Sequence, residues 1–152
     1  MAKATGCRVA ATTHKESKLH LLSEADEAIL DDGSLKGKIK GVTKVLDLAG
    51  PKSLKDTLYS VENGTIVCNT GNLGGVYSLN YFDPIKDIPN GVYLTGFFSN
   101  YPTQKIMSDI FKFIDQHHIQ PEIGTLFSFD DIDEACKALD NGSVDGKIVV
   151  VI

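Results

Sequence analysis

Residues 44–75 read KVLDLAGPKSLKDTLYSVENGTIVCNTGNLGG, and this stretch decides the fold class. It opens with a short apolar run, Lys44–Ala49, which ends at the chain-breaking pair Gly50-Pro51. Apolar residues at helical spacing follow, namely Leu54, Leu58 and Val61. A second apolar run, Gly64–Asn69, then enters a glycine-rich loop. A strand, a helix and a second buried strand in this order predict a parallel βαβ unit.

The same alternation extends in both directions from this stretch. Apolar runs predict further strands at Cys7–Thr12, Glu27–Leu30, Gly91–Phe98, Ile123–Phe129 and Lys147–Ile152. Helical spacing predicts one helix over Gln104–His117 and another through Ile132, Ala135, Cys136 and Leu139, with Asp130 as its N-cap and Asp133 at N3. Strands that alternate with helices predict an α/β protein with a parallel sheet.

The length, net charge and hydropathy of the chain disfavour several classes of function. The 152 residues suffice for one ordinary globular domain with a hydrophobic core. The net charge of −5 disfavours nucleic acid or an anionic membrane surface as partner. No apolar run approaches the length of a membrane span and no secretory signal follows Met1, so we expect a cytoplasmic protein.

The sequence offers no obvious catalytic or metal-binding group. The three cysteines are isolated from one another, and the four histidines lack the spacing of zinc ligands. The acidic pairs Asp31-Asp32 and Asp130-Asp131 fall in a turn and at a helix start, where structural roles are the simpler interpretation. We therefore predict no metal site and assign no catalytic residue.

The glycines do not form a dinucleotide fingerprint. No two of the 14 glycines are spaced i, i+2, so the motif G-x-G-x-x-G is absent. The segment Gly71–Gly75 is glycine-rich, but taken alone it is read more simply as the exit from a strand than as a ligand loop.

A polar segment follows the first predicted strand. An NAD site would place an acidic residue there to hold the ribose 2′-hydroxyl, whereas this chain has Thr13, Lys15 and Lys18. A hydroxyl and two cations suit a 2′-phosphate. On spacing alone, a solvated helix N-terminus remains the simpler alternative.

The order of motifs resembles the C-terminal portion of a medium-chain dehydrogenase/reductase, closest to the quinone oxidoreductase branch. The segments that carry the resemblance are 4–13 (ATGCRVAATT), 44–50 (KVLDLAG), 64–67 (GTIV), 70–75 (TGNLGG), 129–135 (FDDIDEA) and 146–150 (GKIVV). Together they cover nearly the whole chain.

The resemblance implies an incomplete domain. In that family a catalytic domain precedes a Rossmann domain, and this chain begins inside the first Rossmann helix, without the first strand and its glycine-rich loop. Residues 1–118 are thus expected to form an incomplete NAD(P)-binding Rossmann domain, an α/β fold with a Rossmann-like doubly wound parallel sheet. Residues 119–152 are expected to form a βαβ segment that would pack on the missing catalytic domain.

The resemblance also implies where a cofactor would bind. Thr13, Lys15 and Lys18 match the 2′-phosphate position of NADPH-preferring relatives. The loops after the later strands contribute Ala49, Gly50, Thr70, Gly71 and Leu73, and Phe98 lies near the nicotinamide. No catalytic residue maps onto this chain, and the quinone oxidoreductase branch dispenses with the catalytic zinc.

Two functions follow from the resemblance. The first is the cofactor-binding portion of an NADPH-dependent, zinc-free oxidoreductase that reduces a quinone or an enone-like acceptor by hydride transfer. For this function, we expect a complete form of the protein to bind NADP(H). This chain alone is expected to bind NADP(H) weakly or not at all. The alternative is a non-catalytic fragment that acts by self-association or by docking to a separate N-terminal partner. Because the missing strand is central in the order 3-2-1-4-5-6, we expect a homo-oligomer, with Ile148–Ile152 as the donor of a covering strand.

Overall fold

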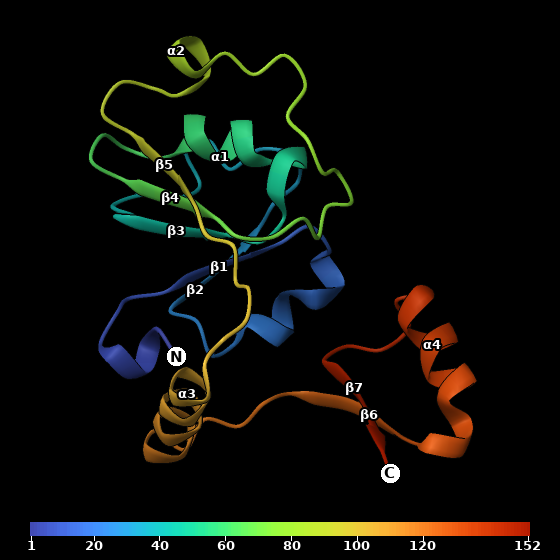
Figure 1. Ribbon diagram of the computed structural model, residues 1–152. Coiled ribbons are helices and arrows are strands. Elements are labelled where there is room, and N and C mark those ends of the chain that lie inside the picture. The colour runs from blue at the N-terminus through green and yellow to red at the C-terminus, as the bar shows by residue number, and fades with distance from the viewer. The chain divides into compact units, whose positions relative to one another are not determined.

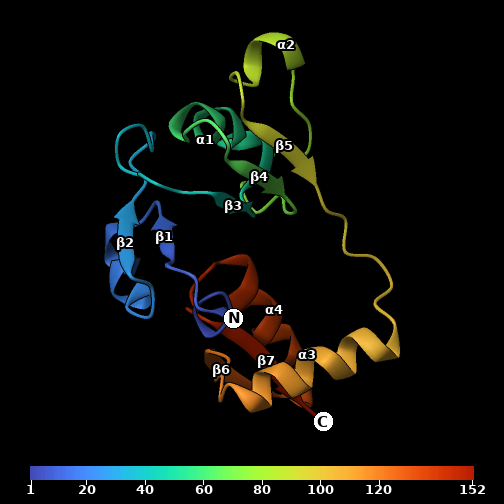
Figure 2. The same ribbon diagram turned by 90° about the vertical axis from the view of Figure 1, so that its left-hand side faces the viewer.

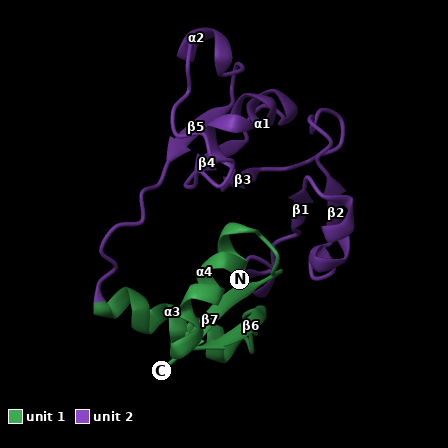
Figure 3. Cartoon of the chain, turned by 90° about the vertical axis from the view of Figure 1, so that its right-hand side faces the viewer, with its two compact units in different colours: residues 1, 104–152 green, residues 2–103 purple.

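The computed structural model describes all 152 residues, which fall into two compact units (Figure 3). Residues 2–103 form the larger unit, and residues 104–152 together with Met1 form the smaller one. None of the helices combines the length and the hydropathy that crossing a membrane requires.

The larger unit contains two parallel sheets. In one, β1 (Ala10–Thr13) pairs with β2 (Glu27–Leu30). In the other, β4 (Ile66–Asn69) lies between β3 (Lys44–Asp47) and β5 (Tyr93–Gly96). All of these pairings are parallel, so the predicted α/β class with parallel strands is confirmed.

Short helices connect the strands of the larger unit. They are η1 (Lys3–Thr5), η2 (Glu16–Leu22), η3 (Gly50–Lys52), α1 (Leu54–Ser60) and α2 (Pro84–Asp87), where η denotes a 3₁₀ helix. The predicted helix after Pro51 is present as α1, which covers one face of the three-stranded sheet (Figure 1).

Only one face of the three-stranded sheet is part of the core. Leu54 and Leu58 of α1 pack with Val67 and Val92, and all four side chains are buried. Side chains alternate between the two faces of a strand, so Leu46 and its neighbours on the other strands point away from α1. The second face is open and apolar, with Leu46, Ile66, Tyr93 and Phe97 exposed.

The smaller unit is a helix followed by a strand–helix–strand arrangement. It comprises α3 (Gln104–Gln116), β6 (Ile123–Ser128), η4 (Phe129–Asp131), α4 (Ile132–Asp140) and β7 (Lys147–Val151). β6 and β7 are parallel and α4 crosses between them, as the sequence predicts for this stretch. That 119–152 packs on a further domain stays a prediction.

The structure corrects several local predictions. The first strand begins at Ala10 and not at Cys7, because the chain before it turns and Cys7 N donates to Ala2 O. The predicted capping by Asp130 is wrong. Instead, Ser128 Oγ accepts from Asp130 N at 3.4 Å, and η4 precedes α4. The apolar spacing does not predict the short helix α2, which Asp83 caps.

Candidate functional site

The loops after β3 and β4 are joined by backbone hydrogen bonds at the carboxyl edge of the sheet. Thr70 N donates to Asp47 O, which extends the ladder by one residue. Beyond the strands, Leu73 N donates to Leu48 O and Gly74 N to Ala49 O, both at 2.9 Å. The two loops therefore form one rigid edge.

Two glycines permit this close approach. A Cβ on Gly71 would lie 2.6 Å from Leu48 O, and one on Gly50 would lie 2.4 Å from Gly71 O. Gly50 also has a φ of +80°, in the left-handed region that favours glycine. The close contact between the two loops thus explains why glycine occupies these positions. The spacing of the glycines along the sequence could not reveal this contact.

Asp47 is a buried carboxylate beneath this edge. Its side chain is buried, and its Oδ1 accepts from Gly50 N at 2.8 Å. Its Oδ2 is buried without a hydrogen-bond partner. Sequence reasoning did not single out Asp47, although an acidic residue inside the apolar run Lys44–Ala49 is the signal that marks it.

The predicted residues of these loops come together, and two of them are exposed. Thr70 Oγ1 donates to Phe97 O at 2.8 Å and so ties the β4 loop to the segment after β5. Leu73 and Phe98 expose 83% and 85% of their surface, respectively. The structure therefore brings together Ala49, Gly50, Thr70, Gly71 and Leu73. Phe98 directly follows Phe97, whose carbonyl oxygen accepts the hydrogen bond from Thr70.

The segment after β1 forms a second group. Thr13 Oγ1 accepts from Lys15 N at 3.2 Å, and Lys18 N donates to Lys15 O at 2.9 Å. Lys15 is exposed and has no salt-bridge partner, whereas Lys18 is half-buried. No hydrogen bond links Thr13 or Lys15 to the loops after β3 and β4, so the predicted site residues form two groups in the larger unit.

The acids with altered pKa lie outside both groups. A hydrogen bond from Lys3 lowers the pKa of Asp26, and one from Lys38 lowers that of Asp32. A hydrogen bond from Lys55 likewise lowers the pKa of Asp87. Asp26 and Asp32 belong to exposed ion pairs of ordinary surface character, whereas the side chain of Asp87 is only 17% exposed.

The histidines and cysteines do not gather into a metal site. No three side chains of His, Cys, Asp or Glu lie close enough together to hold a metal ion. The chain therefore provides no ligand set for zinc.

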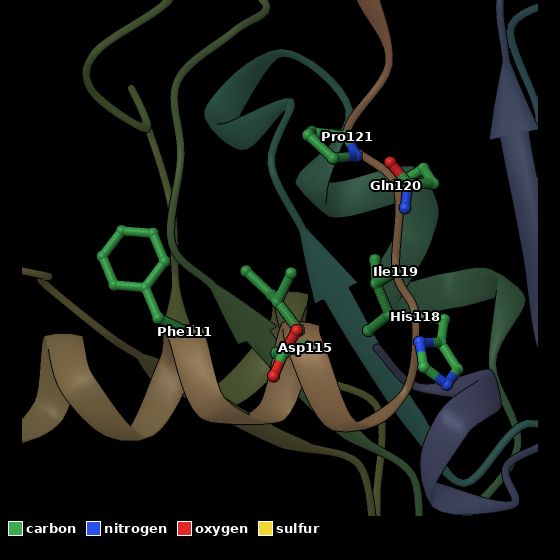
Figure 4. A pocket seen from close by; sticks show the side chains of 7 residues that line it. Phe111, Asp115, His118, Ile119, Gln120 and Pro121 are labelled. Carbon is green, nitrogen blue, oxygen red and sulfur yellow. The ribbon is translucent and has the colours of Figure 1, made fainter.

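Two cavities lie within the smaller unit, and no predicted site residue lines either of them. One, of about 450 Å³, is found where the chain leaves α3 and is lined by Phe111, Asp115 and residues 118–121 (Figure 4). The other, of about 480 Å³, is a mostly apolar hollow between α4 and β7. The first cavity includes the polar side chains of Asp115, His118 and Gln120, whereas Lys147 is the only charged residue of the second.

Comparison with known proteins gives a family and a fold. A family model described as zinc-binding dehydrogenase matches residues 23–150. Similar solved structures include a mycobacterial quinone oxidoreductase (20% identity, TM-score 0.80) and the quinone oxidoreductase of Thermus thermophilus, solved also in complex with NADPH (21%, 0.73). A third is the Bacillus subtilis protein yhfP with NAD bound (21%, 0.72).

These structures are matched over part of their length. They cover 99%, 99% and 98% of this chain, which in turn covers 51%, 52% and 48% of theirs. The chain therefore spans about half the length of these solved relatives. A search of the curated proteins finds no match.

Proposed function

The chain belongs to the zinc-binding dehydrogenase family, within the medium-chain dehydrogenases/reductases, and from that premise we propose that its larger unit is the cofactor-binding portion of an NADPH-dependent oxidoreductase. The incomplete Rossmann domain of residues 1–118 is part of this proposal. So is the reduction of a quinone or an enone-like acceptor, and the quinone oxidoreductase of Thermus thermophilus, solved also in complex with NADPH, supports the quinone.

One observation carries the proposal, namely the rigid edge at the carboxyl ends of β3 and β4. Ligands of open parallel sheets bind outside the carboxyl ends of the strands. There, Leu73 N and Gly74 N hold the two loops in one shape, and the exposed side chains of Leu73 and Phe98 offer apolar surface to a planar ring. Ala49, Gly50, Thr70 and Gly71 supply the backbone of that surface.

The preference for NADPH rests on the segment after β1. The exposed Lys15 has no carboxylate to neutralise it, and the Thr13 hydroxyl holds the backbone of Lys15 in a turn. A free ammonium and a nearby hydroxyl suit a 2′-phosphate, and Lys18 adds a second positive charge.

When bound, the cofactor supplies a hydride from nicotinamide C4, and this chain positions it. The residues present do not fit the zinc of the family's description, because no ligand set gathers among them. No step of the proposal depends on a metal.

An NMR titration of the 152-residue chain tests the proposal. We expect binding of NADPH on the order of 1 mM, about −4 kcal/mol, because no glycine-rich loop of the dinucleotide type is present to hold the pyrophosphate. The shifted amides should lie at Thr13–Lys18, Leu73 and Phe98. Shifts confined to the smaller unit would reject the cofactor role. A low-micromolar affinity would reject the reason given for weak binding.

The second candidate is a non-catalytic fragment that docks to another polypeptide. One specific observation favours it. β1 and β3 are edge strands of two separate sheets, and no hydrogen bond joins them.

A further inference from the structure

Asparagine is followed directly by glycine in several turns of this chain. The pairs are Asn63-Gly64, Asn90-Gly91 and Asn141-Gly142, and each residue of each pair is exposed and lies in a turn. Asparagine is among the chemically labile residues of proteins. A following glycine favours the loss of its side-chain amide, because glycine has no side chain to obstruct the approach of its nitrogen. Sequence and exposure alone therefore do not distinguish the pairs.

The reaction to which such a pair is prone begins at the backbone nitrogen of the glycine. This nitrogen loses its proton and attacks the side-chain carbonyl carbon of the asparagine. The new C–N bond closes a succinimide ring, and the side-chain nitrogen takes up a proton and leaves as ammonia. Water then opens the ring at either carbonyl group and gives aspartate or isoaspartate. A glycine N–H that donates to a carbonyl loses its proton slowly, for the same reason that hydrogen-bonded amides exchange slowly.

Hydrogen bonds hold the glycine nitrogen of two of the pairs. Gly64 N donates to Gly91 O at 2.8 Å, and Gly142 N donates to Leu139 O at 3.1 Å. The side chain of Asn63 also packs against Gly91, since a Cβ on Gly91 would overlap it. The pairs that begin at Asn63 and Asn141 are therefore protected by the fold.

The pair Asn90-Gly91 forms the centre of a β-turn between α2 and β5 (Figure 2). Val92 N donates to Pro89 O at 3.0 Å and closes the turn, while Gly91 has a φ of +75°. The peptide between the two central residues takes no part in the closing bond of such a turn, and its rotation interconverts types I and II. Gly91 O accepts from Gly64 N, but Gly91 N donates no hydrogen bond. This nitrogen is thus free to lose its proton and to turn toward the Asn90 side chain.

We propose that Asn90 is a site of spontaneous deamidation, and that the hydrogen bonds of Gly64 N and Gly142 N protect Asn63 and Asn141. The products add a negative charge to the exposed turn. Isoaspartate also adds a backbone carbon to the turn, directly before the core residue Val92. The proposal is independent of the cofactor role, because no predicted cofactor residue lies in these turns.

The test follows the rate at each asparagine in the intact chain. The chain is incubated at mildly alkaline pH, in parallel with a sample unfolded in concentrated urea, and then digested with trypsin. Lysines separate Asn63, Asn90 and Asn141, so each falls in its own peptide. Mass spectrometry detects the exchange of NH2 for OH, and fragmentation assigns its position. The rate in urea gives each asparagine its own reference, which removes the effect of the neighbouring sequence.

We expect folding to slow the initial rate at Asn63 and at Asn141 by about tenfold or more, and the rate at Asn90 by less than about threefold. Equal slowing at all three asparagines would overturn the proposal. So would a folded chain in which Asn63 or Asn141 reacts before Asn90, or in which Asn90 stays intact while the unfolded chain reacts.

Two glutamine variants form a matched pair. Asn90→Gln keeps the amide but moves its carbonyl carbon one bond further from the glycine nitrogen, so the fast reaction should be lost. Asn141→Gln makes the same change at a protected pair and should leave the fast reaction unaltered. A fast reaction that persists in Asn90→Gln would assign it to another residue and refute the proposal. The comparison of folded and unfolded rates in the unaltered chain depends on neither variant.

Discussion

Gly71 lies where the loops after β3 and β4 touch, and its missing side chain can be tested directly. Gly71→Ala should lower the free energy of unfolding by about 1–3 kcal/mol, because the new Cβ would meet Leu48 O at 2.6 Å. Urea denaturation followed by circular dichroism measures the effect. Gly96→Ala is the control, since its Cβ would stay 3.9 Å from Asn69 O. Equal stability of the two variants would contradict the close approach.

The cations after β1 are tested by charge reversal. The double variant Lys15→Glu, Lys18→Glu should abolish the preference for NADPH over NADH, because two carboxylates repel the 2′-phosphate. Titrations of both cofactors, followed by amide shifts, measure the preference. The matched control is Lys36→Glu with Lys40→Glu, which changes the net charge by the same amount elsewhere in the chain. This control should keep the preference for NADPH. A double variant that still prefers NADPH would remove these residues from the site.

At the scale of elements, one ion pair joins α1 to α2. Lys55 Nζ lies 2.8 Å from Asp87 Oδ2, which also accepts from Asp83 N. The hydrogen bond from Lys55 lowers the pKa of Asp87 below its ordinary value of 3.8. Because the folded-state pKa is the lower one, this contribution to stability is present above pH 3.8 and lost as the pH falls through the folded-state pKa.

An NMR titration of the Asp87 carboxyl should thus give a midpoint below 3.8. Lys55→Met, which keeps most of the aliphatic stem, should raise that midpoint toward 3.8 and weaken the loss of stability in acid. Lys86→Met is the control, because its ammonium lies on Asp83 and contributes less to Asp87. A midpoint that does not respond to Lys55→Met would refute the assigned cause.

At the scale of the whole molecule, the open face of the three-stranded sheet predicts self-association. Leu46, Ile66, Tyr93 and Phe97 expose between 41% and 67% of their surface, which makes an apolar area of the kind that associates in water. We expect a dimer or higher oligomer at micromolar concentration by light scattering after size exclusion. Leu46→Lys should shift it to monomer without loss of folding, since Leu46 is outside the core. A monomer for the unaltered chain would reject the predicted homo-oligomer.

Local sequence determined the elements of this protein. In residues 44–75 the apolar runs, Pro51 and the spacing of Leu54 and Leu58 fix a strand, a helix and a strand, because apolar periodicity reports which side chains can be buried together. The same signal located β2, β6, α3 and β7 within a few residues. The alternation of these strands and helices predicts the α/β class without information on contacts between distant residues.

Tertiary structure alone decided which distant backbones meet. The sequence marks Gly71 but not its contact with Leu48 O, and it contains Asp47 without indicating its buried bond to Gly50 N. It places β1 and β3 as strands but does not say that no hydrogen bond joins them. Such pairings depend on the approach of segments far apart in the chain. Periodicity within one segment carries no information about that approach, because it records only the balance of polar and apolar side chains along that segment.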